Sequence, residues 1–545
     1  MRGWCVVLAV CALLFDVTAA ANRRSLRDVS RRGQDKANKA VREATHERLN
    51  ARQTNSSTTA TSQFLTSATA KYKVDSLPDV NFDIGEMYSG LIPIDEKNAS
   101  RALFFMFNPT IGKPVDEITI WLNGGPGCSS LEGFFQENGR FLWQPGTFAP
   151  VENPYSWVNL TNMLWVEQPV GTGFSIGEVT ATTEEEIAQD FIKFFKNWET
   201  TFGIKNYKIY VTGESYAGRY VPYISAAMLD EKDKEYYDLS GALVYDPCIG
   251  QFDYTQEEVP AVPFVLENQA LLQFNDSFLA QLESLDQSCG YAEYREKYLT
   301  FPPPGNQPAV FFNYTSEANC DVFDMIDNAA LENNPCFDIY EVNQQCPLLW
   351  DVLSFPTQLV YTPEGAMTYF NRSDVKAAIH APSYVDWAEC AVNPVIVGGV
   401  EVDGYYNGGP EGEGDLSADP IQHVLPQVIE ATSRVLVSNG DFDMIIITNG
   451  TLMAIQNMTW NGKLGFQREP DTPIVINEID LEYQSVFDAN GYNGADGPQG
   501  TMGVQHYERG LMWAETYLSG HMQPEFQPRV TYRHLEWVLG RIDVL

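Results

Sequence analysis

Positive charge and long apolar runs are both scarce in this sequence of 545 residues. Lysine and arginine number 35 against 72 aspartates and glutamates, which gives a formal net charge of −37. Such an acidic chain repels nucleic acid and anionic lipid, so we predict neither as a partner. Beyond residue 21, no stretch approaches the roughly 20 apolar residues of a membrane helix, and we expect no membrane anchor.

Motifs that bind metals or nucleotides are also missing. The sequence has no His-Glu-x-x-His pair. Its glycine-rich segment 124–127 lacks the Lys-Ser/Thr of a phosphate-binding loop and the spacing of a dinucleotide-binding fingerprint. We therefore predict no metal site and no cofactor.

The first residues have the composition of a targeting segment. Arg2 precedes an apolar run from Trp4 to Phe15, and small residues follow, which is typical of a signal peptide over residues 1–21. Residues 22–70 are basic and then rich in serine and threonine, which predicts a removable propeptide or disordered leader. We expect a protein that is secreted or vacuolar. The acidic remainder suits work at acidic pH, where carboxylate repulsion falls.

Cysteines and glycosylation sequons agree with the secretory pathway. Two of nine cysteines lie in the predicted signal peptide, so seven remain and an odd one must stay unpaired. Asn-x-Ser/Thr sequons, which predict glycosylation, lie at Asn55, Asn98, Asn159, Asn275, Asn313, Asn371, Asn449 and Asn457.

Strand-like and helix-like segments alternate over residues 71–250, which predicts an α/β fold with a mostly parallel sheet. The pattern loosens over 251–389, where four of the remaining cysteines lie, and we predict an inserted, disulfide-stapled cap there. Core character returns over 390–545. The clearest strands are predicted at 117–122, 162–167, 208–212, 242–245, 434–438 and 511–518, and a last helix at 532–539.

Ser215 lies between an alternating strand and a helix-compatible run, in the sequence Gly-Glu-Ser-Tyr-Ala. A nucleophile elbow needs small residues two positions either side of its serine, because the strand and helix backbones approach closely. Gly213 and Ala217 meet that need. The alternative is an ordinary strand–helix turn with an exposed serine.

Two further segments could supply the partners of such a serine. Asp443 follows a buried-type strand, with Asp441 as the alternative acid, and His521 follows an apolar run. The order Ser, Asp, His is that of α/β-hydrolases. His506 and His534 also lie beyond Asp443, but their contexts favour surface or packing roles.

Six segments, in this order, resemble motifs of the serine carboxypeptidase family, most of all its fungal secreted and vacuolar branch. They are residues 121–130, 153–157, 162–175, 207–220, 434–443 and 520–522. The resemblance implies an α/β-hydrolase fold and an enzyme that releases amino acids from peptide and protein C-termini at acidic pH. It implies Ser215 as nucleophile, His521 as general base and Asp443 as the acid that orients it.

The resemblance also implies binding roles. The backbone N–H groups of Gly125 and Tyr216 would form the oxyanion hole, and the substrate's terminal carboxylate would be bound by Asn123, Gly124, Glu137 and Glu214. A glutamic acid donates a hydrogen bond only when protonated, and two glutamates in one site raise the pKa of one of them. Glu137 taken alone could instead be a solvated helix residue.

The pocket for the leaving residue departs from the family pattern. The resemblance places Glu132, Gln136 and Met522 there, and the polar Glu132 and Gln136 favour a shift from apolar towards basic C-terminal residues. Its cysteine pattern implies a Cys128–Cys390 bridge, with the nested pairs Cys289–Cys346 and Cys320–Cys336 and a free Cys248.

Two other functions stay open at this stage. A family member could have become an acyltransferase, which keeps the triad and replaces water by another nucleophile. A non-catalytic glycoprotein could use the scaffold for binding, although an intact Ser215, Asp443 and His521 argues against it. Oligomeric state is not indicated by the sequence.

Overall fold

The computed structural model describes residues 62–111, 113–308, 320–347, 349–354, 365–397, 400–402, 405–407, 415–476 and 500–545. The predicted signal peptide and residues 22–61 of the predicted leader lie outside the described residues, as do the sequons at Asn55 and Asn313. Among the described residues, no helix is both long and apolar enough to cross a membrane.

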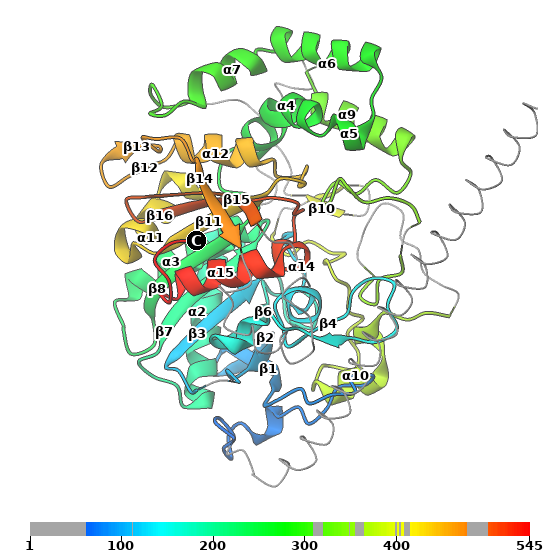
Figure 1. Ribbon diagram of the computed structural model, residues 1–545. Helices are drawn as coiled ribbons and strands as arrows, with labels where there is room; N and C mark the ends of the chain where they lie inside the picture. The colour runs from blue at the N-terminus through cyan, green and yellow to red at the C-terminus, as the bar shows by residue number, and fades with distance from the viewer. Residues whose placement is uncertain are drawn as a thin grey trace, which may run out of the picture. The chain divides into compact units, whose positions relative to one another are not determined.

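A ten-stranded mixed sheet forms the centre of the fold (Figure 1). Its strands, in spatial order, are β1 (Tyr88–Asp95), β2 (Asn98–Asn108), β6 (Asn162–Glu167), β3 (Glu117–Leu122), β7 (Lys208–Glu214), β8 (Asp238–Tyr245), β11 (Val435–Gly440), β16 (Leu511–Thr516), β15 (Gly500–Glu508) and β14 (Thr472–Ile476). The six from β6 to β16 are parallel. Short two-stranded ribbons pair β4 (Phe141–Leu142) with β5 (Val151–Glu152), β9 (Val400–Val402) with β10 (Tyr405–Asn407), and β12 (Thr459–Trp460) with β13 (Lys463–Leu464).

The parallel strands match the sequence predictions because their residues are buried on both faces. Every residue of β3, β6 and β11 is buried, and such strands show as continuous apolar runs. The predicted strands 117–122 and 162–167 coincide with β3 and β6. The sequence did not predict the antiparallel strand pairs at the two edges of the sheet, β1–β2 and β14–β15.

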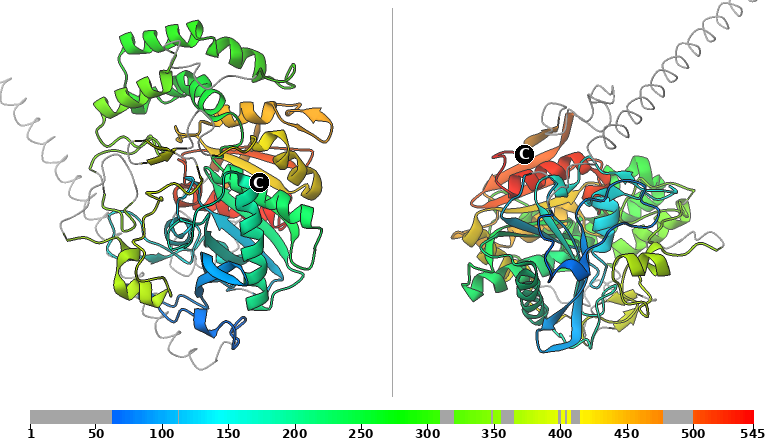
Figure 2. Two further views of the ribbon diagram at one scale, coloured as in Figure 1. Left: turned by 180° about the vertical axis from the view of Figure 1, so that it is seen from behind. Right: turned by 90° about the horizontal axis from the view of Figure 1, so that it is seen from below.

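Helices cover both faces of the sheet. In Figures 1 and 2, α2 (Glu184–Phe202), α3 (Ala217–Glu231) and α11 (Val424–Thr432) lie on one face and α15 (Pro528–Val538) on the other. On α2, Phe191, Phe195, Trp198 and Phe202 recur at helical spacing and are all buried, which places one apolar face on the sheet. The remaining helices are α4 (Val259–Glu267), α5 (Gln269–Leu272), α6 (Asp276–Ser288), α7 (Tyr291–Tyr298), α9 (Val322–Asn333), α10 (Ser373–Ala378), α12 (Thr448–Gln456) and α14 (Gln523–Phe526).

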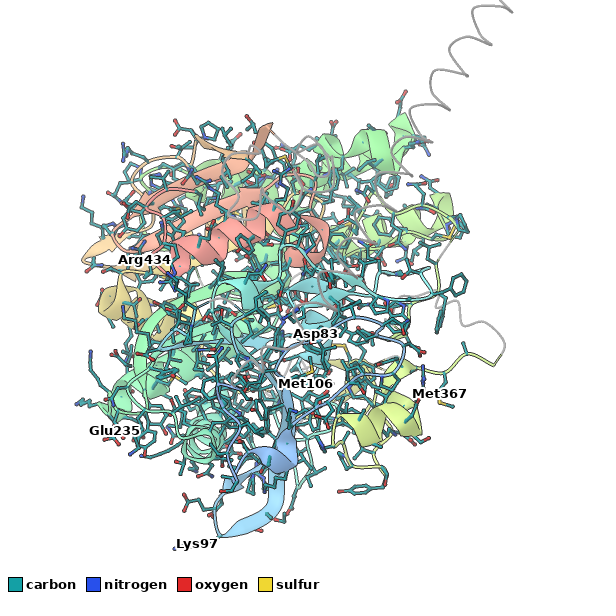
Figure 3. The ribbon with its side chains drawn as sticks, turned by 60° about the horizontal axis from the view of Figure 1, so that its bottom comes forward. Asp83, Lys97, Met106, Glu235, Met367 and Arg434 are labelled. Carbon is teal, nitrogen blue, oxygen red and sulfur yellow. A yellow bond between two sulfur atoms is a disulfide. The ribbon has the colours of Figure 1, made fainter. Side chains whose placement is uncertain are left out.

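The hairpin of β1 and β2 shows the change from core to surface along one strand pair. Met106 on β2 is fully buried, and Figure 3 shows it among the inner side chains. Lys97, between the two strands, projects from the hairpin tip in the same view. Phe107 packs edge-on against Trp198 of α2, with ring centroids 4.9 Å apart, and this contact holds α2 against the hairpin.

The helices of the predicted cap have an apolar core of their own. Buried side chains of α4, α6, α7 and α9 pack together, and this cluster continues to Met453 of α12. A cap over 251–389, with a core over 71–250 and 390–545, remains our proposal for the domain division.

Two predicted disulfides are wrong. The cap pairs Cys289 with Cys320 and Cys336 with Cys346, in place of the nested Cys289–Cys346 and Cys320–Cys336 bridges. The reason is the packing of α6 against α9, which brings Cys289, directly after α6, beside Cys320, two residues before α9. The predicted Cys128–Cys390 bridge is present and Cys248 is free.

Candidate active site

Ser215 occupies a strained turn between β7 and α3. Its φ of 62° lies in the left-handed region, which non-glycine residues rarely adopt. Three backbone hydrogen bonds hold the turn: Ser215 N donates to Tyr245 O (2.9 Å), and Ser215 O accepts from Gly218 N (2.8 Å) and Cys248 N (3.0 Å). This is the geometry of a nucleophile elbow, which presents the serine hydroxyl at the carboxyl edge of the sheet.

Close backbone contacts around Ser215 leave no room for larger side chains at the neighbouring small residues. A Cβ at Gly213 would lie 2.3 Å from Leu122 O and 2.7 Å from Cβ of Ala217. A Cβ at Gly124 would lie 2.6 Å from Cβ of Ser215 and 2.5 Å from Tyr216 N. The glycine-rich loop and the elbow are therefore in direct contact.

The loop of the proposed oxyanion hole is fixed at both sides. Gly125 has a φ of 110°, which a side chain would disfavour. Cys128 N donates to Gly124 O (3.0 Å), and the Cys128–Cys390 bridge joins the loop to the segment after the cap. Ser129 N donates to the backbone oxygen of Glu389 (2.6 Å). Such restraint is what a preorganised oxyanion hole needs.

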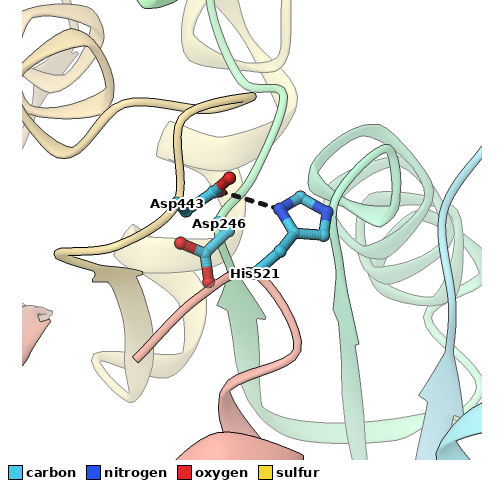
Figure 4. Close-up of side chains that lie close together, drawn as sticks. All are labelled: Asp246, Asp443 and His521. Atoms are coloured by element: carbon cyan, nitrogen blue, oxygen red, sulfur yellow. Dashed lines mark hydrogen bonds and ion pairs between the residues drawn. The ribbon is translucent and has the colours of Figure 1, made fainter. Parts of the chain in front are cut away.

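His521 and Asp443 form the second part of the constellation (Figure 4). His521 Nδ1 lies 2.8 Å from Asp443 Oδ2, and Ile445 N donates to Asp443 Oδ1 (2.9 Å). Burial lowers the pKa of His521 to about 4. Its Nε2 is buried and has no hydrogen-bond partner among the described residues, Ser215 included, so this nitrogen is left to accept a proton.

The cap supports His521 directly. Tyr340 O accepts from His521 N (2.8 Å), and the Tyr340 ring lies edge-on to the imidazole with centroids 5.1 Å apart. Met444 N, next to Asp443, donates to Ile339 O (2.9 Å). The loop closed by the Cys336–Cys346 bridge thus packs against both residues of the pair.

A single amide gathers three carboxyl groups beside the elbow. Asn123 Nδ2 donates to Glu214 Oε1 (2.8 Å), Glu137 Oε1 (3.2 Å) and Glu132 Oε2 (3.2 Å). Its Oδ1 accepts from Trp121 Nε1 (2.8 Å) and Gly133 N (3.3 Å), and this fixes which way the amide faces. Glu214 directly precedes Ser215, so the cluster lies next to the candidate nucleophile.

These carboxyl groups are neutral acids over part of the acidic range. Burial raises the pKa of Glu137 and of Glu214 well above the ordinary value, and repulsion by neighbouring glutamates adds to it. Glu137 Oε2 and Glu214 Oε2 are buried and have no hydrogen-bond partner among the described residues, so a proton shared between the two carboxyl groups would satisfy both. The same cause, burial, raises the pKa of Glu132.

More acids extend this cluster. Glu389 is buried, both of its carboxyl oxygens lack a hydrogen-bond partner among the described residues, and burial raises its pKa. Gln136 Nε2 donates to Asp351 Oδ1 (2.9 Å), and burial raises the pKa of Glu525 to about 8. Of the predicted pocket residues, Glu132 and Gln136 join this network, and Met522 is buried beside His521 in the chain.

Two sets of side chains could hold a cation by distance alone. The ligand atoms of Asp246, Asp443 and His521 lie within 4.8 Å of one another, as do those of Glu132, Glu137 and Glu214. Hydrogen bonds from His521 and Asn123 already engage members of each set. These contacts account for both sets without an ion, and the absence of a metal stays a prediction.

Sequence reasoning missed Asp246, Glu389 and Glu525. Asp246 directly follows β8, so its place at the carboxyl edge of a predicted strand was a usable signal. Glu389 precedes Cys390, whose bridge leads to the oxyanion loop. His506 and His534 pack as predicted: His506 bonds Glu508 (3.1 Å), and His534 is fully buried.

Among the described sequons, Asn98 and Asn275 are exposed, whereas the other four are half-buried. Asn371 has the most engaged amide, since its Nδ2 donates to Trp387 O (2.7 Å) and its Oδ1 accepts from Trp387 N (2.8 Å). Glycosylation at these positions stays a prediction, strongest at Asn98 and Asn275.

Comparison with known sequences finds serine carboxypeptidases. The family model described as serine carboxypeptidase matches residues 78–541. Serine-type carboxypeptidase F of Aspergillus niger is 67% identical over 483 residues, which are 89% of each chain. A carboxypeptidase Y homolog of Arthroderma benhamiae is 39% identical over 88% of this chain and 89% of its own.

A solved structure agrees on the fold. Kex1(delta)p, a prohormone-processing carboxypeptidase from Saccharomyces cerevisiae, aligns with a TM-score of 0.59 at 22% identity, covering 87% of this chain and 96% of its own. The mostly parallel sheet and the strained serine turn are those of the α/β-hydrolase fold. On the family match and the identity to its members, this chain belongs to the serine carboxypeptidase family.

Proposed function

We propose that this protein releases amino acids one at a time from free C-termini of peptides and proteins, through an acyl-enzyme on Ser215. The observation that carries the proposal is the Asn123 amide, which holds Glu137 and Glu214 beside the elbow. An endopeptidase or a general esterase has no use for such a group, whereas a carboxypeptidase must bind a terminal carboxylate next to its nucleophile.

In this mechanism Ser215 Oγ attacks the scissile carbonyl and His521 Nε2 takes its proton. Asp443, 2.8 Å from Nδ1, orients the imidazole and stabilises the imidazolium. The backbone N–H groups of Tyr216 and Gly125 stabilise the oxyanion. His521 then protonates the leaving amine, and water hydrolyses the ester by the reverse proton transfers.

The glutamate pair explains how a carboxylate can be bound by acids. While Glu137 and Glu214 retain a proton, the pair and Asn123 can donate hydrogen bonds to the substrate's terminal carboxylate. Loss of that proton leaves charges that repel it. Because the pKa of His521 is about 4, the base is neutral over the same acidic range, and we propose an acidic working pH.

We further propose that the leaving residue is preferentially lysine or arginine. The buried carboxyl groups around the binding amide include Glu132 and Glu389, and Glu389 has two oxygens without a hydrogen-bond partner among the described residues. A cationic side chain would supply the missing donors and relieve the repulsion among these acids.

The protein is proposed to act in the secretory pathway, in the vacuole or outside the cell. Three disulfides among the described residues support an oxidising compartment. The predicted signal peptide and basic leader support the same route, with the leader as a propeptide.

The test is product analysis with and without a competing nucleophile. Purified protein is incubated at about pH 5 with a peptide ending in Leu-Arg, and products are read by mass spectrometry. We expect a ladder that loses residues from the C-terminus in water alone. An acyltransferase would give products only with an added amine or alcohol, and a binding protein would leave the peptide intact under both conditions.

A further inference from the structure

Asp246 is a buried acid beside the proposed triad to which the mechanism above gives no role. It directly follows β8, whose last residue, Tyr245, accepts the hydrogen bond from Ser215 N (2.9 Å). Figure 4 shows its carboxyl group beside Asp443 and His521. Their potential ligand atoms lie within 4.8 Å of one another, and neither aspartate is exposed.

The Asp246 carboxyl group is held in one orientation. Gly440 N donates to Oδ1 (2.7 Å) and Gln523 Nε2 donates to Oδ2 (2.6 Å). Gln523 is itself oriented, because its Oε1 accepts from Ser438 Oγ (2.9 Å). Gly440 ends β11, and Gln523 begins α14 two residues after His521, so Asp246 ties together the segments that carry both partners of the pair.

We propose that Asp246 is a positioning residue of the triad, a neutral carboxylic acid that donates a hydrogen bond to the Asp443 carboxylate and so holds it against His521. This inference rests on the proposed roles of Asp443 and His521. Two carboxyl groups in this contact cannot both be ionised cheaply, because both are buried and close like charges repel. One proton between them removes the repulsion and makes the hydrogen bond.

The surroundings favour the neutral acid. Burial raises the pKa of both aspartates. For Asp246 the charge of Asp443 adds to burial and outweighs the hydrogen bonds from Gly440 and Gln523, whereas hydrogen bonds from Ile445 N and Asp246 lower the pKa of Asp443, so the shared proton rests on Asp246.

The other titratable groups that face the two aspartates or His521 are Asp338 and Tyr340 from the cap, Glu214 at the end of β7, Tyr245 and Cys248. None of these is a permanent cation, so nothing in this set offsets a second negative charge.

The neutral state has a consequence for the base. With Asp246 protonated, the imidazolium of His521 is stabilised by the charge of Asp443 and, from the cap, by that of Asp338, and gains nothing from Asp246. An ionised Asp246 would raise the pKa of His521 by about one unit or more, since a charge within about 4 to 6 Å shifts a pKa by roughly 1 to 3 units. The shared proton thus keeps His521 available as a base at acidic pH.

The test compares Asp246→Asn with Asp246→Ala, using an uncharged ester or C-terminally amidated substrate so that the Glu137–Glu214 pair does not enter. Asparagine keeps a neutral donor, although its NH₂ group replaces one of the two oxygens that accept from Gly440 and Gln523. We expect Asp246→Asn to keep the acid limb of kcat/KM within about 0.3 pH unit of wild type. Asp246→Ala should lose about 10- to 100-fold in kcat with little change in KM, because the donor to a charged group is gone.

Asp441→Asn is the matched control. Asp441 lies in the same loop, accepts from Ser519 N (3.3 Å) and is not in the cluster of Asp246, Asp443 and His521, so its variant should keep both kcat and the acid limb. A fall of about one unit in the acid limb of Asp246→Asn would overturn the proposal, because it would mean that an ionised Asp246 had been removed.

Wild-type kcat in a folded Asp246→Ala would overturn it as well. If the alanine variant does not fold, the asparagine profile alone decides. Failure of the proposed function would look different, since wild type would then not hydrolyse the substrate or Ser215→Ala would still do so.

Discussion

Glu137 and Glu214 share the amide of Asn123 as hydrogen-bond donor, at 3.2 and 2.8 Å, and each has a second, buried oxygen without a partner among the described residues. Glu137 is the last residue of the short helix η2 (Gly133–Glu137), which follows the glycine-rich loop, and Glu214 is the last residue of β7. Their meeting links recognition of the substrate's C-terminus to the residue that precedes the nucleophile. It also makes binding depend on a proton.

The first prediction concerns that proton. Burial raises the pKa of the pair, so its proton is retained above about pH 4.3, the pKa of a free glutamate, and is lost once the pH exceeds the raised pKa. Above that point, peptide hydrolysis by wild type should fall by about tenfold per pH unit. Glu137→Gln and Glu214→Gln should move or remove this fall in kcat/KM, since an amide donates at any pH.

Its control is Glu199→Gln, which changes another buried glutamate with a raised pKa, on α2. That variant should keep the wild-type profile. A C-terminally amidated substrate should show mainly the rise set by His521. If both site variants kept the wild-type fall in kcat/KM above about pH 6, that fall would have to come from the titration of another group.

The second prediction concerns the leaving residue. Glu389→Gln should lower kcat/KM for peptides ending in arginine or lysine by about tenfold, as expected for one lost charge-assisted contact, and should leave peptides ending in leucine within about twofold. Matched peptides that differ only in the last residue measure it, with Glu199→Gln again as control. An equal loss for both kinds of peptide would assign Glu389 a structural role instead.

The third prediction concerns stability. Burial raises the pKa of Glu167 to about 7, of Glu258 and Glu341 to about 8, and of Glu199 to about 9. The folded protein therefore binds more protons than the unfolded chain above about pH 5, and its free energy of unfolding must fall as pH rises towards 9. Thermal unfolding should show a Tm several degrees lower at pH 8 than at pH 5.

At low pH the buried histidines reverse the trend, and the free energy of unfolding falls as pH falls. The pKa of His521 is lowered to about 4 and that of His534 to about 3, so their stabilising effect is lost as pH falls from about 6.5 through these values. The stability maximum should lie near pH 5. A Tm that rises steadily from pH 5 to pH 8 would contradict the neutral state of the buried glutamates.

The fourth prediction concerns the cap disulfides. Peptide mapping without reduction should find Cys289 joined to Cys320 and Cys336 joined to Cys346, with Cys248 as the free thiol. Replacing both Cys336 and Cys346 by serine should lower kcat more than it changes KM, because the loop between them contacts His521 through Tyr340. Any bridge to Cys248 would refute the pairing.

Much of the fold and site could be predicted because the signals are local. A parallel strand buried on both faces, such as β3, is a continuous apolar run, and the elbow requires small residues at Gly213 and Ala217 within five positions. The order of Ser215, Asp443 and His521 then indicated the fold family.

What could not be predicted depends on packing between distant segments. Cysteine spacing does not say that α6 packs against α9, and that contact decides the partner of Cys289. Asp246 reaches the active site because β8 pairs with β11, and Glu389 because the adjacent Cys390 is bridged to Cys128. Neither contact can be seen in the local sequence. Strand β15, which lies between β16 and the edge strand β14, interrupts its alternation with Gly503, so its pattern is weak.

The fifth prediction tests the central claim, that Ser215 is the nucleophile. A fluorophosphonate should label wild type once, and peptide sequencing by mass spectrometry should place the adduct on Ser215, with peptidase activity lost in proportion to labelling. Ser215→Ala should be unlabelled and inactive with an unchanged Tm, while the control Ser240→Ala on β8 should behave as wild type. An adduct on another residue, or labelling and peptide hydrolysis that persist in Ser215→Ala, would contradict the account.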